Sequence, residues 1–236
     1  TVYKVEHTQM GKTAAVKLLH ANLANDKDLI KRFHREATAI SRLNHPNIVG
    51  VYDFGQAEGL YYFVMEYVDG VNLRQTEQTE ELSTAQALTI IPRICDALQY
   101  AHDEGIVHRD LTPRNVLIRP DWTPVVVDLE IALEESSDVR VTGPNRVLGT
   151  PLFVPPEVLQ GREPSCRGDL YSVGVMMFQC LTGQPPFKGT SFPEMVLAVQ
   201  RGRAPSVRSF SPDLPVVVAS VIDRLLHRDP ERRPGS

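Results

Sequence analysis

The segment 108–117 limits what this chain can fold into more than any other stretch, because it joins a base, a positive charge and a carboxamide to an apolar run. Asp110 can accept the proton of a hydroxyl group, and Asn115, five residues later, can turn its amide oxygen toward a metal ion. Arg109 supplies the positive charge beside Asp110. The plain alternative is a surface loop that carries charge by chance, and the other motifs of the chain weigh against it.

Length and charge exclude several classes of protein. The 236 residues suit one two-lobed domain or two small ones. A net charge of −4 argues against a nucleic-acid partner, because binding phosphates needs a basic surface. No apolar run approaches the roughly 18 residues of a membrane helix, and no apolar leader is visible, so we expect no membrane segment and a cytoplasmic location. The three cysteines lack zinc-site spacing, so we expect buried thiols in a reducing compartment.

Hydrophobic periodicity predicts strands first and helices later. Residues 1–6 and 13–19 alternate as strands do, and strand patterns recur at 49–54 and 60–65. A helical stripe covers 26–43, and a second helical pattern runs from Ser83 to Gly105 with Pro92 inside it. The predicted organisation is therefore a β-rich first part and a helical second part.

The loop matches the catalytic loop of protein kinases, which reads His-Arg-Asp-Leu, three variable residues and Asn. The chain therefore resembles the eukaryotic-type (Hanks-type) serine/threonine protein kinase family over essentially its whole length. The resemblance implies an α+β, bilobal protein kinase-like fold, with a small β-rich N-lobe that includes one helix and a larger, mainly α-helical C-lobe. It implies one domain over residues 1–236, with the N-lobe at about 1–66, the hinge at about 66–70 and the C-lobe at about 71–236. We expect both ends to be cuts within a domain, and a parent protein could carry a membrane anchor elsewhere.

The resemblance implies ATP and Mg²⁺ as cofactors, together with a set of catalytic residues. Asp110 corresponds to the catalytic base and Lys17 to the strand lysine that pairs the α- and β-phosphates. Glu36 corresponds to the helix glutamate that forms an ion pair with Lys17. Asn115 and Asp128 correspond to the two metal ligands.

The same resemblance implies a nucleotide pocket. Met65 corresponds to the gatekeeper, and the backbone of the hinge residues would bind adenine. The valine that follows the family's glycine-rich loop matches the second residue of the chain, so the glycines would lie before residue 1. The implied nucleotide-binding residues, besides Lys17 and Asp128, are Val2, Ala15, Met65, Glu66, Val68 and Leu117.

Further motifs correspond to scaffold and regulation. The resemblance pairs Glu157 with Arg233 and assigns Asp169 to brace the backbone of the catalytic loop at the start of a long buried helix. Residues 131–157 correspond to the activation segment, where a phosphate could pair with Arg109. Hydroxyl groups available for modification there belong to Ser136, Ser137 and Thr142.

The activity that the resemblance implies is transfer of the ATP γ-phosphoryl group to Ser/Thr hydroxyls of protein substrates in signalling. The segment 149–157 favours the serine/threonine branch, although Arg114 sits where tyrosine kinases carry an arginine. Regulatory partners or self-association would accompany such a role.

Two departures from the family keep another function open. Thr112 replaces a lysine that contacts the γ-phosphate, and Glu130 replaces the glycine of the metal-binding motif, while Leu129 replaces its Phe as an apolar plug. A pseudokinase that binds nucleotide or acts as a scaffold is therefore the alternative. A small-molecule phosphotransferase is a third hypothesis. Without the glycine-rich loop, we expect residues 1–236 alone to have weak or no activity.

Overall fold

The computed structural model describes residues 1–18, 27–79, 82–129 and 151–235. Glu130 and the predicted modification sites at 136, 137 and 142 lie outside these ranges.

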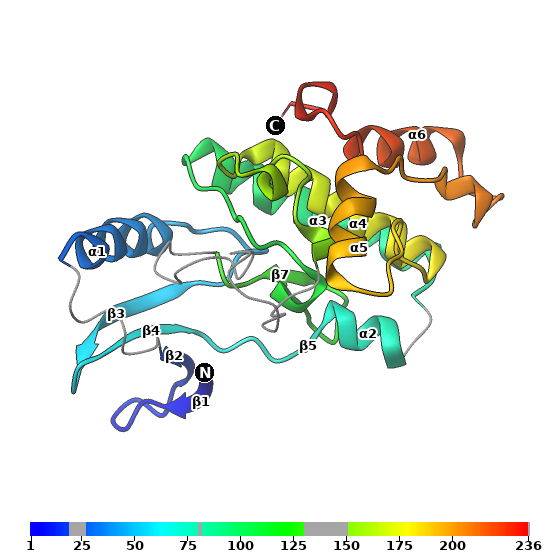
Figure 1. Ribbon diagram of the computed structural model, residues 1–236. Helices are drawn as coiled ribbons and strands as arrows, with labels where there is room; N and C mark the ends of the chain where they lie inside the picture. Colours follow the sequence, from blue (N-terminus) through cyan, green and yellow to red (C-terminus); the bar gives the residue numbers. More distant parts are fainter. Residues whose placement is uncertain (19–26, 80–81, 130–150, 236) are drawn as a thin grey trace.

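A four-stranded antiparallel sheet with the strand order β1-β2-β4-β3 builds the N-terminal part (Figure 1). The β3–β4 hairpin turns at Glu58 and Gly59, which both have positive φ (51° and 81°), as a two-residue turn between twisted strands requires. A buried cluster of Ala37, Tyr61 and Phe63 packs helix α1 on the sheet. The elements are β1 (Val2–Glu6), β2 (Thr13–Leu18), α1 (Lys27–Ser41), β3 (Val51–Ala57) and β4 (Leu60–Glu66).

A second, smaller antiparallel sheet lies next to the helical part, with β5 (Val71–Asn72), β6 (Val116–Ile118) and β7 (Pro124–Val126) in that order. Since β4 ends at Glu66 and β5 begins at Val71, the predicted hinge segment connects the two sheets. Gly70 passes so close to β6 that an added Cβ would lie 2.4 Å from the carbonyl oxygen of Ile118.

Helices dominate the rest of the chain, as predicted (Figure 1). Helix α3 follows an N-terminal capping box in which Ser83 and Gln86 satisfy each other's backbone groups. The buried helix α4 begins before the predicted Asp169, because Ser165 caps it by accepting the N–H of Gly168. The helices are α2 (Leu73–Thr79), α3 (Thr84–Asp103), α4 (Cys166–Thr182), α5 (Phe192–Arg201) and α6 (Val216–Leu225), with short 3₁₀ helices η2 (Pro113–Asn115), η3 (Pro151–Phe153), η4 (Val158–Gln160), η5 (Val207–Ser209) and η6 (Pro230–Arg232).

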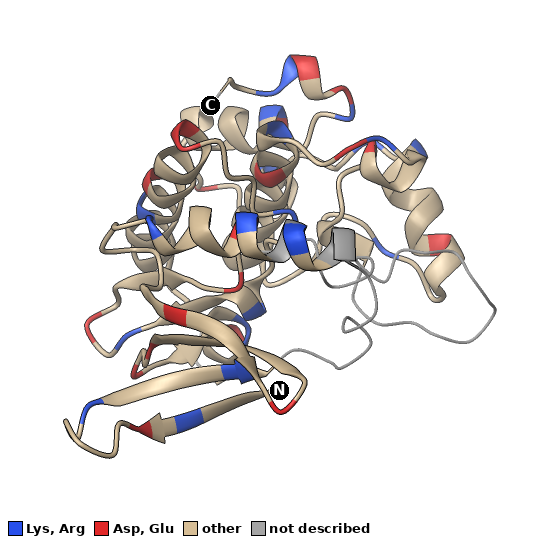
Figure 2. Cartoon of the chain, turned by 90° about the vertical axis from the view of Figure 1, so that its left-hand side faces the viewer, with Lys and Arg blue, Asp and Glu red and all other residues tan. Residues whose placement is uncertain are grey.

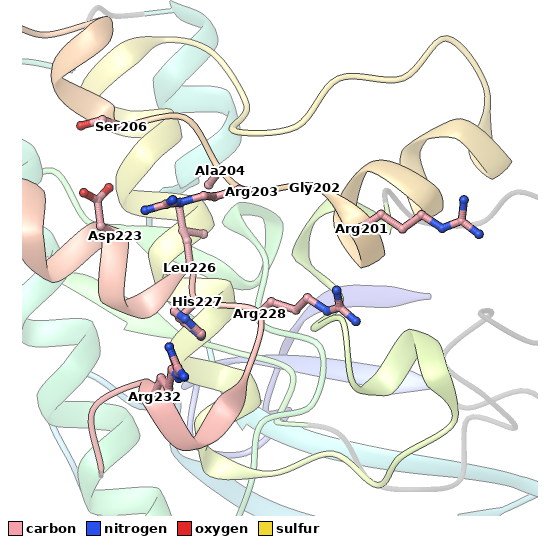
Figure 3. A pocket seen from close by; sticks show the side chains of 10 residues that line it. All are labelled: Arg201, Gly202, Arg203, Ala204, Ser206, Asp223, Leu226, His227, Arg228 and Arg232. Carbon is pink, nitrogen blue, oxygen red and sulfur yellow. The ribbon is translucent and has the colours of Figure 1, made fainter.

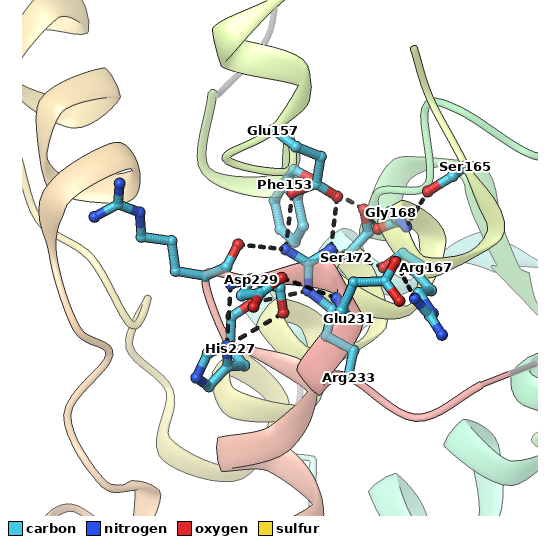
Figure 4. A network of polar contacts seen from close by, with 11 residues as sticks. Phe153, Glu157, Ser165, Arg167, Gly168, Ser172, His227, Asp229, Glu231 and Arg233 are labelled. Carbon is cyan, nitrogen blue, oxygen red and sulfur yellow. Dashed lines mark hydrogen bonds and ion pairs between the residues drawn. The ribbon is translucent and has the colours of Figure 1, made fainter. Parts of the chain in front are cut away.

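The predicted pair between Glu157 and Arg233 is confirmed and closes the end of the chain onto the helical core (Figure 4). Two guanidinium nitrogens meet the two carboxylate oxygens at 2.7 and 2.8 Å, and the side chains are only 6% and 0% exposed. Arg233 also donates to the carbonyl groups of Arg167, His227 and Arg228. The buried charges are therefore matched by charge and by hydrogen bonds, as burial requires.

Acidic and basic residues alternate along much of the described chain. Figure 2 shows acidic and basic positions interspersed along the strands and helices. In the described part of the chain, no helix combines the length and apolar character needed to cross a membrane.

Candidate active site

One buried carboxylate holds the start of the predicted catalytic loop. Asp169, at the beginning of α4, accepts the backbone N–H groups of His108 at 2.8 Å and Arg109 at 3.0 Å. It also meets the ring Nε2 of His102 at 2.8 Å. The predicted bracing role of Asp169 is therefore confirmed.

These bonds stabilise an unusual backbone. Arg109 has φ of 71°, a left-handed conformation that costs a non-glycine residue roughly 1–2 kcal/mol. The turn leaves His108 fully buried, with its Nε2 3.2 Å from the carbonyl oxygen of Val127, while Asp110 is exposed. The loop thus presents Asp110 to the surface on a fixed support.

Asn115 and Asp110 are joined directly. The amide nitrogen of Asn115 donates to the carbonyl oxygen of Asp110 at 2.8 Å and to its carboxylate at 3.0 Å. The short helix η2 makes this contact possible, since the N–H of Asn115 bonds to the carbonyl oxygen of Thr112. With its nitrogen committed to Asp110, the amide oxygen of Asn115 is the atom left to face a cation.

Asp128 lies beside this loop. The N–H of Val127 donates to the carbonyl oxygen of Asn115 at 2.9 Å, which links the end of β7 to the loop. Asp128 itself has φ of 57°, and the next residue, Leu129, is buried in the main core as the predicted apolar plug. The backbone bond of Val127 therefore places Asp128 next in the chain to a residue that contacts Asn115.

Lys17 and Glu36 each form an ion pair with a further residue of the site, and the predicted pair between the two stays a prediction. In the described part of the chain, Nζ of Lys17 lies 3.2 Å from a carboxylate oxygen of Asp128, and Glu36 lies 3.8 Å from the guanidinium of Arg109. Each of these ion pairs joins two elements. Lys17 on β2 contacts Asp128 after β7, and Glu36 on α1 contacts Arg109 in the catalytic loop. Sequence register alone does not decide between such neighbouring carboxylates.

Sheet register and one apolar cluster place several of the predicted nucleotide-binding residues beside one another. Ala15 pairs with Met65 across β2 and β4, and Val2 pairs with Lys17 across β1 and β2. Met65 and Leu117 pack against a buried cluster that includes Val68. The N–H of Glu66 donates to the carbonyl oxygen of Gly50 at 2.8 Å.

Two contacts were missed by sequence reasoning. The guanidinium of Arg119 donates to the carboxylate of Glu66 at 2.6 Å and so ties the hinge to the β6–β7 turn. The second contact is the bond between the ring of His102 and the carboxylate of Asp169. The partners lie 53 and 67 residues apart in the sequence, and no local pattern signals either contact.

The donor atoms fit a magnesium ion better than a metal held by protein alone. Within the described ranges, no group of three or more His, Cys, Asp or Glu side chains could hold a metal. Asp128 and Asn115 offer a carboxylate and an amide oxygen, and Mg²⁺ is commonly bound by one or two such ligands together with phosphates and water.

Comparisons with known proteins agree with this geometry. The profile of the family described as protein kinase domain matches residues 1–236. The chain is 38% identical over 234 residues to the probable serine/threonine-protein kinase PknB of Lactococcus lactis, covering 98% of this chain and 37% of that protein. It is 37% identical over 233 residues to the serine/threonine-protein kinase PrkC of Bacillus subtilis, covering 98% of this chain and 36% of that protein. The chain thus spans little more than a third of the length of these curated relatives.

Solved structures share the fold. The kinase domain of Mycobacterium tuberculosis PknI is 29% identical, with a TM-score of 0.75 over 100% of this chain and 86% of that one. Rad53 in complex with AMP-PNP is 28% identical, with a TM-score of 0.80 over 98% of this chain and 58% of that one. The bilobal α+β prediction is confirmed.

Proposed function

This chain belongs to the protein kinase domain family, and we propose that its protein is an ATP-dependent kinase that transfers the γ-phosphoryl group to serine or threonine hydroxyls of proteins. The observation that carries the proposal is the contact of the Asn115 amide with the carboxylate and backbone of Asp110. Such a contact fixes a carboxylate and frees an amide oxygen, which are the two groups that phosphoryl transfer needs at this loop.

In the proposed phosphoryl transfer, the residues of the site divide the work of proton transfer, phosphate binding and metal binding. Asp110 orients the acceptor hydroxyl and takes its proton, and Asn115 holds Asp110 in place. Lys17 binds the nucleotide phosphates and Glu36 orients Lys17, while Asp128 and Arg109 lie beside them as further charged partners. Asp128 and Asn115 would hold Mg²⁺, which with ATP supplies the phosphoryl group and neutralises its charge.

The apolar cluster supports a place for adenine. Ala15, Met65 and Leu117 would contact its faces, and Val2 would cover the nucleotide beside Lys17. Because the N–H of Glu66 already donates to Gly50, this residue would recognise adenine through its carbonyl group, and Val68 through its backbone N–H.

The free cysteines and the use of ATP support a cytoplasmic site of action. The proposed partners are protein substrates.

The proposal is tested by incorporation of labelled phosphate from ATP into the complete protein itself or into a generic basic protein. We expect incorporation by the wild type and a loss of about 10²-fold or more in Asp110→Asn, because the variant lacks the proton acceptor. Asp96→Asn, an exposed carboxylate on α3, should leave the rate unchanged. No incorporation by the wild type, or equal rates in wild type and Asp110→Asn, would contradict the proposal.

The alternatives give different results in the same preparation. A pseudokinase would show a nucleotide-dependent thermal shift without turnover, and a metabolite kinase would phosphorylate a small molecule but no protein. Of the two departures behind the pseudokinase hypothesis, Thr112 lies in extended backbone just before η2, and Glu130 lies outside the described residues.

A further inference from the structure

A hollow of about 700 Å³ lies on the helical part of the molecule, away from the candidate active site. It is bounded by the C-terminal end of α5, the segment that follows it, and the segment that connects α6 to η6. A second hollow of about 340 Å³ shares three of its lining residues, so the two form one groove. The shared residues are His227, Arg228 and Arg232.

The first hollow is strongly basic although the chain as a whole carries a net charge of −4. Figure 3 shows Arg203, His227 and Arg232 grouped on one side, with Arg201 and Arg228 extending to the other. Asp223 lines the first hollow, and Glu157 and Asp229 line the second.

These arginines are largely uncommitted. Within the described residues, the guanidinium groups of Arg201, Arg203 and Arg228 make no hydrogen bond or ion pair, and all three side chains are exposed. Arg232 forms an ion pair with the exposed Asp229 at 3.8 Å, and an exposed pair of this length contributes little to stability. Nδ1 of His227 lies 3.0 Å from the backbone nitrogen and 3.2 Å from the carbonyl oxygen of Asp229, so the ring is held in place at the edge of the groove.

Arg233, four residues along the chain from Asp229, gives the contrast. Its guanidinium is fully used by Glu157 and three carbonyl groups in the interior. The groove arginines, by contrast, leave most of their N–H donors facing the groove, where they can attract an anion.

We propose that this groove binds a phosphorylated serine or threonine segment of a substrate protein. This inference rests on the proposed function, which it narrows to substrates that already carry a phosphate. Guanidinium groups match phosphate by charge and by paired N–H donors, and several can share its oxygens. The volume accommodates a phosphate with its neighbouring residues, within the range of about 300–1,000 Å³ typical of binding pockets.

A nucleic acid fits the groove less well. Binding a duplex or a long single strand needs a basic surface that follows many phosphates, whereas the chain carries a net charge of −4 and Figure 2 shows acidic and basic positions interspersed in its view. A short concave site with a local excess of arginine suits one or two phosphates on a peptide.

Fluorescence anisotropy with labelled peptides tests the proposal. The probe is a phosphothreonine flanked by glycines and glutamates, and its partner is the same peptide with threonine. We expect the wild-type chain to bind the phosphopeptide at least about tenfold more tightly than the threonine peptide. Arg203→Gln/Arg228→Gln should weaken phosphopeptide binding by about tenfold or more.

The matched control is Arg208→Gln/Arg224→Gln, which removes two neighbouring exposed arginines that do not line the groove. It should change the affinity by less than about twofold, and thermal unfolding should show both double variants folded. Equal affinity for the two peptides, equal losses in the two double variants, or equally tight binding of a single-stranded oligonucleotide or of anionic vesicles would overturn the proposal.

Binding is measured in Asp110→Asn as well, since it needs no catalysis. Phosphopeptide binding without phosphate transfer by the wild type would reject only the kinase activity. Transfer without phosphopeptide binding would reject only the role of the groove.

Discussion

The carboxylate of Asp169 shows how much of the site depends on a single side chain. It is 3% exposed and satisfies two backbone donors of the catalytic loop as well as His102. In Asp169→Asn an amide nitrogen would face donors that need an acceptor, and a buried charge-assisted set would be broken.

We expect Asp169→Asn to lower the free energy of unfolding by about 2–4 kcal/mol in urea denaturation. Asp96→Asn, which changes an exposed aspartate of α3, should stay within about 0.5 kcal/mol of the wild type. If Asp169→Asn lowered the free energy of unfolding no more than Asp96→Asn does, the catalytic loop would not depend on the carboxylate of Asp169.

Two arginines test the difference between a buried and an exposed ion pair. The Arg233 side chain is fully buried with Glu157, whereas Arg109 is 35% exposed and 3.8 Å from Glu36. We expect Arg233→Gln to cost about 3–5 kcal/mol of unfolding free energy, because it leaves Glu157 charged and buried. Arg109→Gln should cost less than about 1 kcal/mol.

Urea denaturation at one pH and salt concentration compares the two variants directly. A cost for Arg109→Gln as large as that for Arg233→Gln would show that the pair with Glu36 is not the weak contact that its exposure and length indicate.

At the scale of elements, a carboxyl group joins α2 to α4. Cys180 donates its S–H to Glu77 at 3.2 Å, and the side chain of Gln179 donates to the other carboxylate oxygen at 3.2 Å. Burial raises the pKa of Glu77, while the hydrogen bond from Cys180 and the charge of Arg74 oppose the rise. Burial also raises the pKa of Cys180, so its thiol stays protonated and remains a donor.

The shifted pKa of Glu77 makes the stability of the protein depend on pH. Because the folded state raises the pKa of Glu77, it favours the protonated form, and this contribution to stability is lost as the pH rises through the folded pKa. We expect Glu77→Gln to be more stable than the wild type at pH 8 and to lose this advantage toward pH 5, as measured by urea denaturation. Glu104→Gln, an exposed glutamate after α3, should show no such trend relative to wild type.

Elements were predictable where the pattern is local. The strands β1, β2 and β4 and the helices α1 and α3 follow apolar periodicity, and Ser83 marks the start of α3. The start of α4 was placed too late, at Asp169, because the cap at Ser165 lies in a polar stretch without apolar periodicity.

At the scale of the whole molecule, the motifs predicted which residues would meet but not every partner. Asn115 bonds to Asp110, and Val127, the neighbour of Asp128, bonds to Asn115, while the roles of these residues stay predictions. The partner of Lys17 depends on how α1 sits relative to the sheet and the catalytic loop, and that placement is a property of packing between lobes. The contact between Arg119 and Glu66 at the hinge also depends on how the two lobes pack against each other.

The anchor of the catalytic loop has a consequence for synthesis of the protein. Asp169 lies 61 residues beyond His108, so the ribosome synthesises the catalytic loop well before it adds the residue whose side chain holds the loop. At about 5–20 residues per second, the nascent loop waits roughly 3–12 s for Asp169. Until then the carboxylate of Asp169 cannot offset the free-energy cost of the left-handed backbone at Arg109. The N-terminal sheet is therefore synthesised before the residue that completes the support of the catalytic loop.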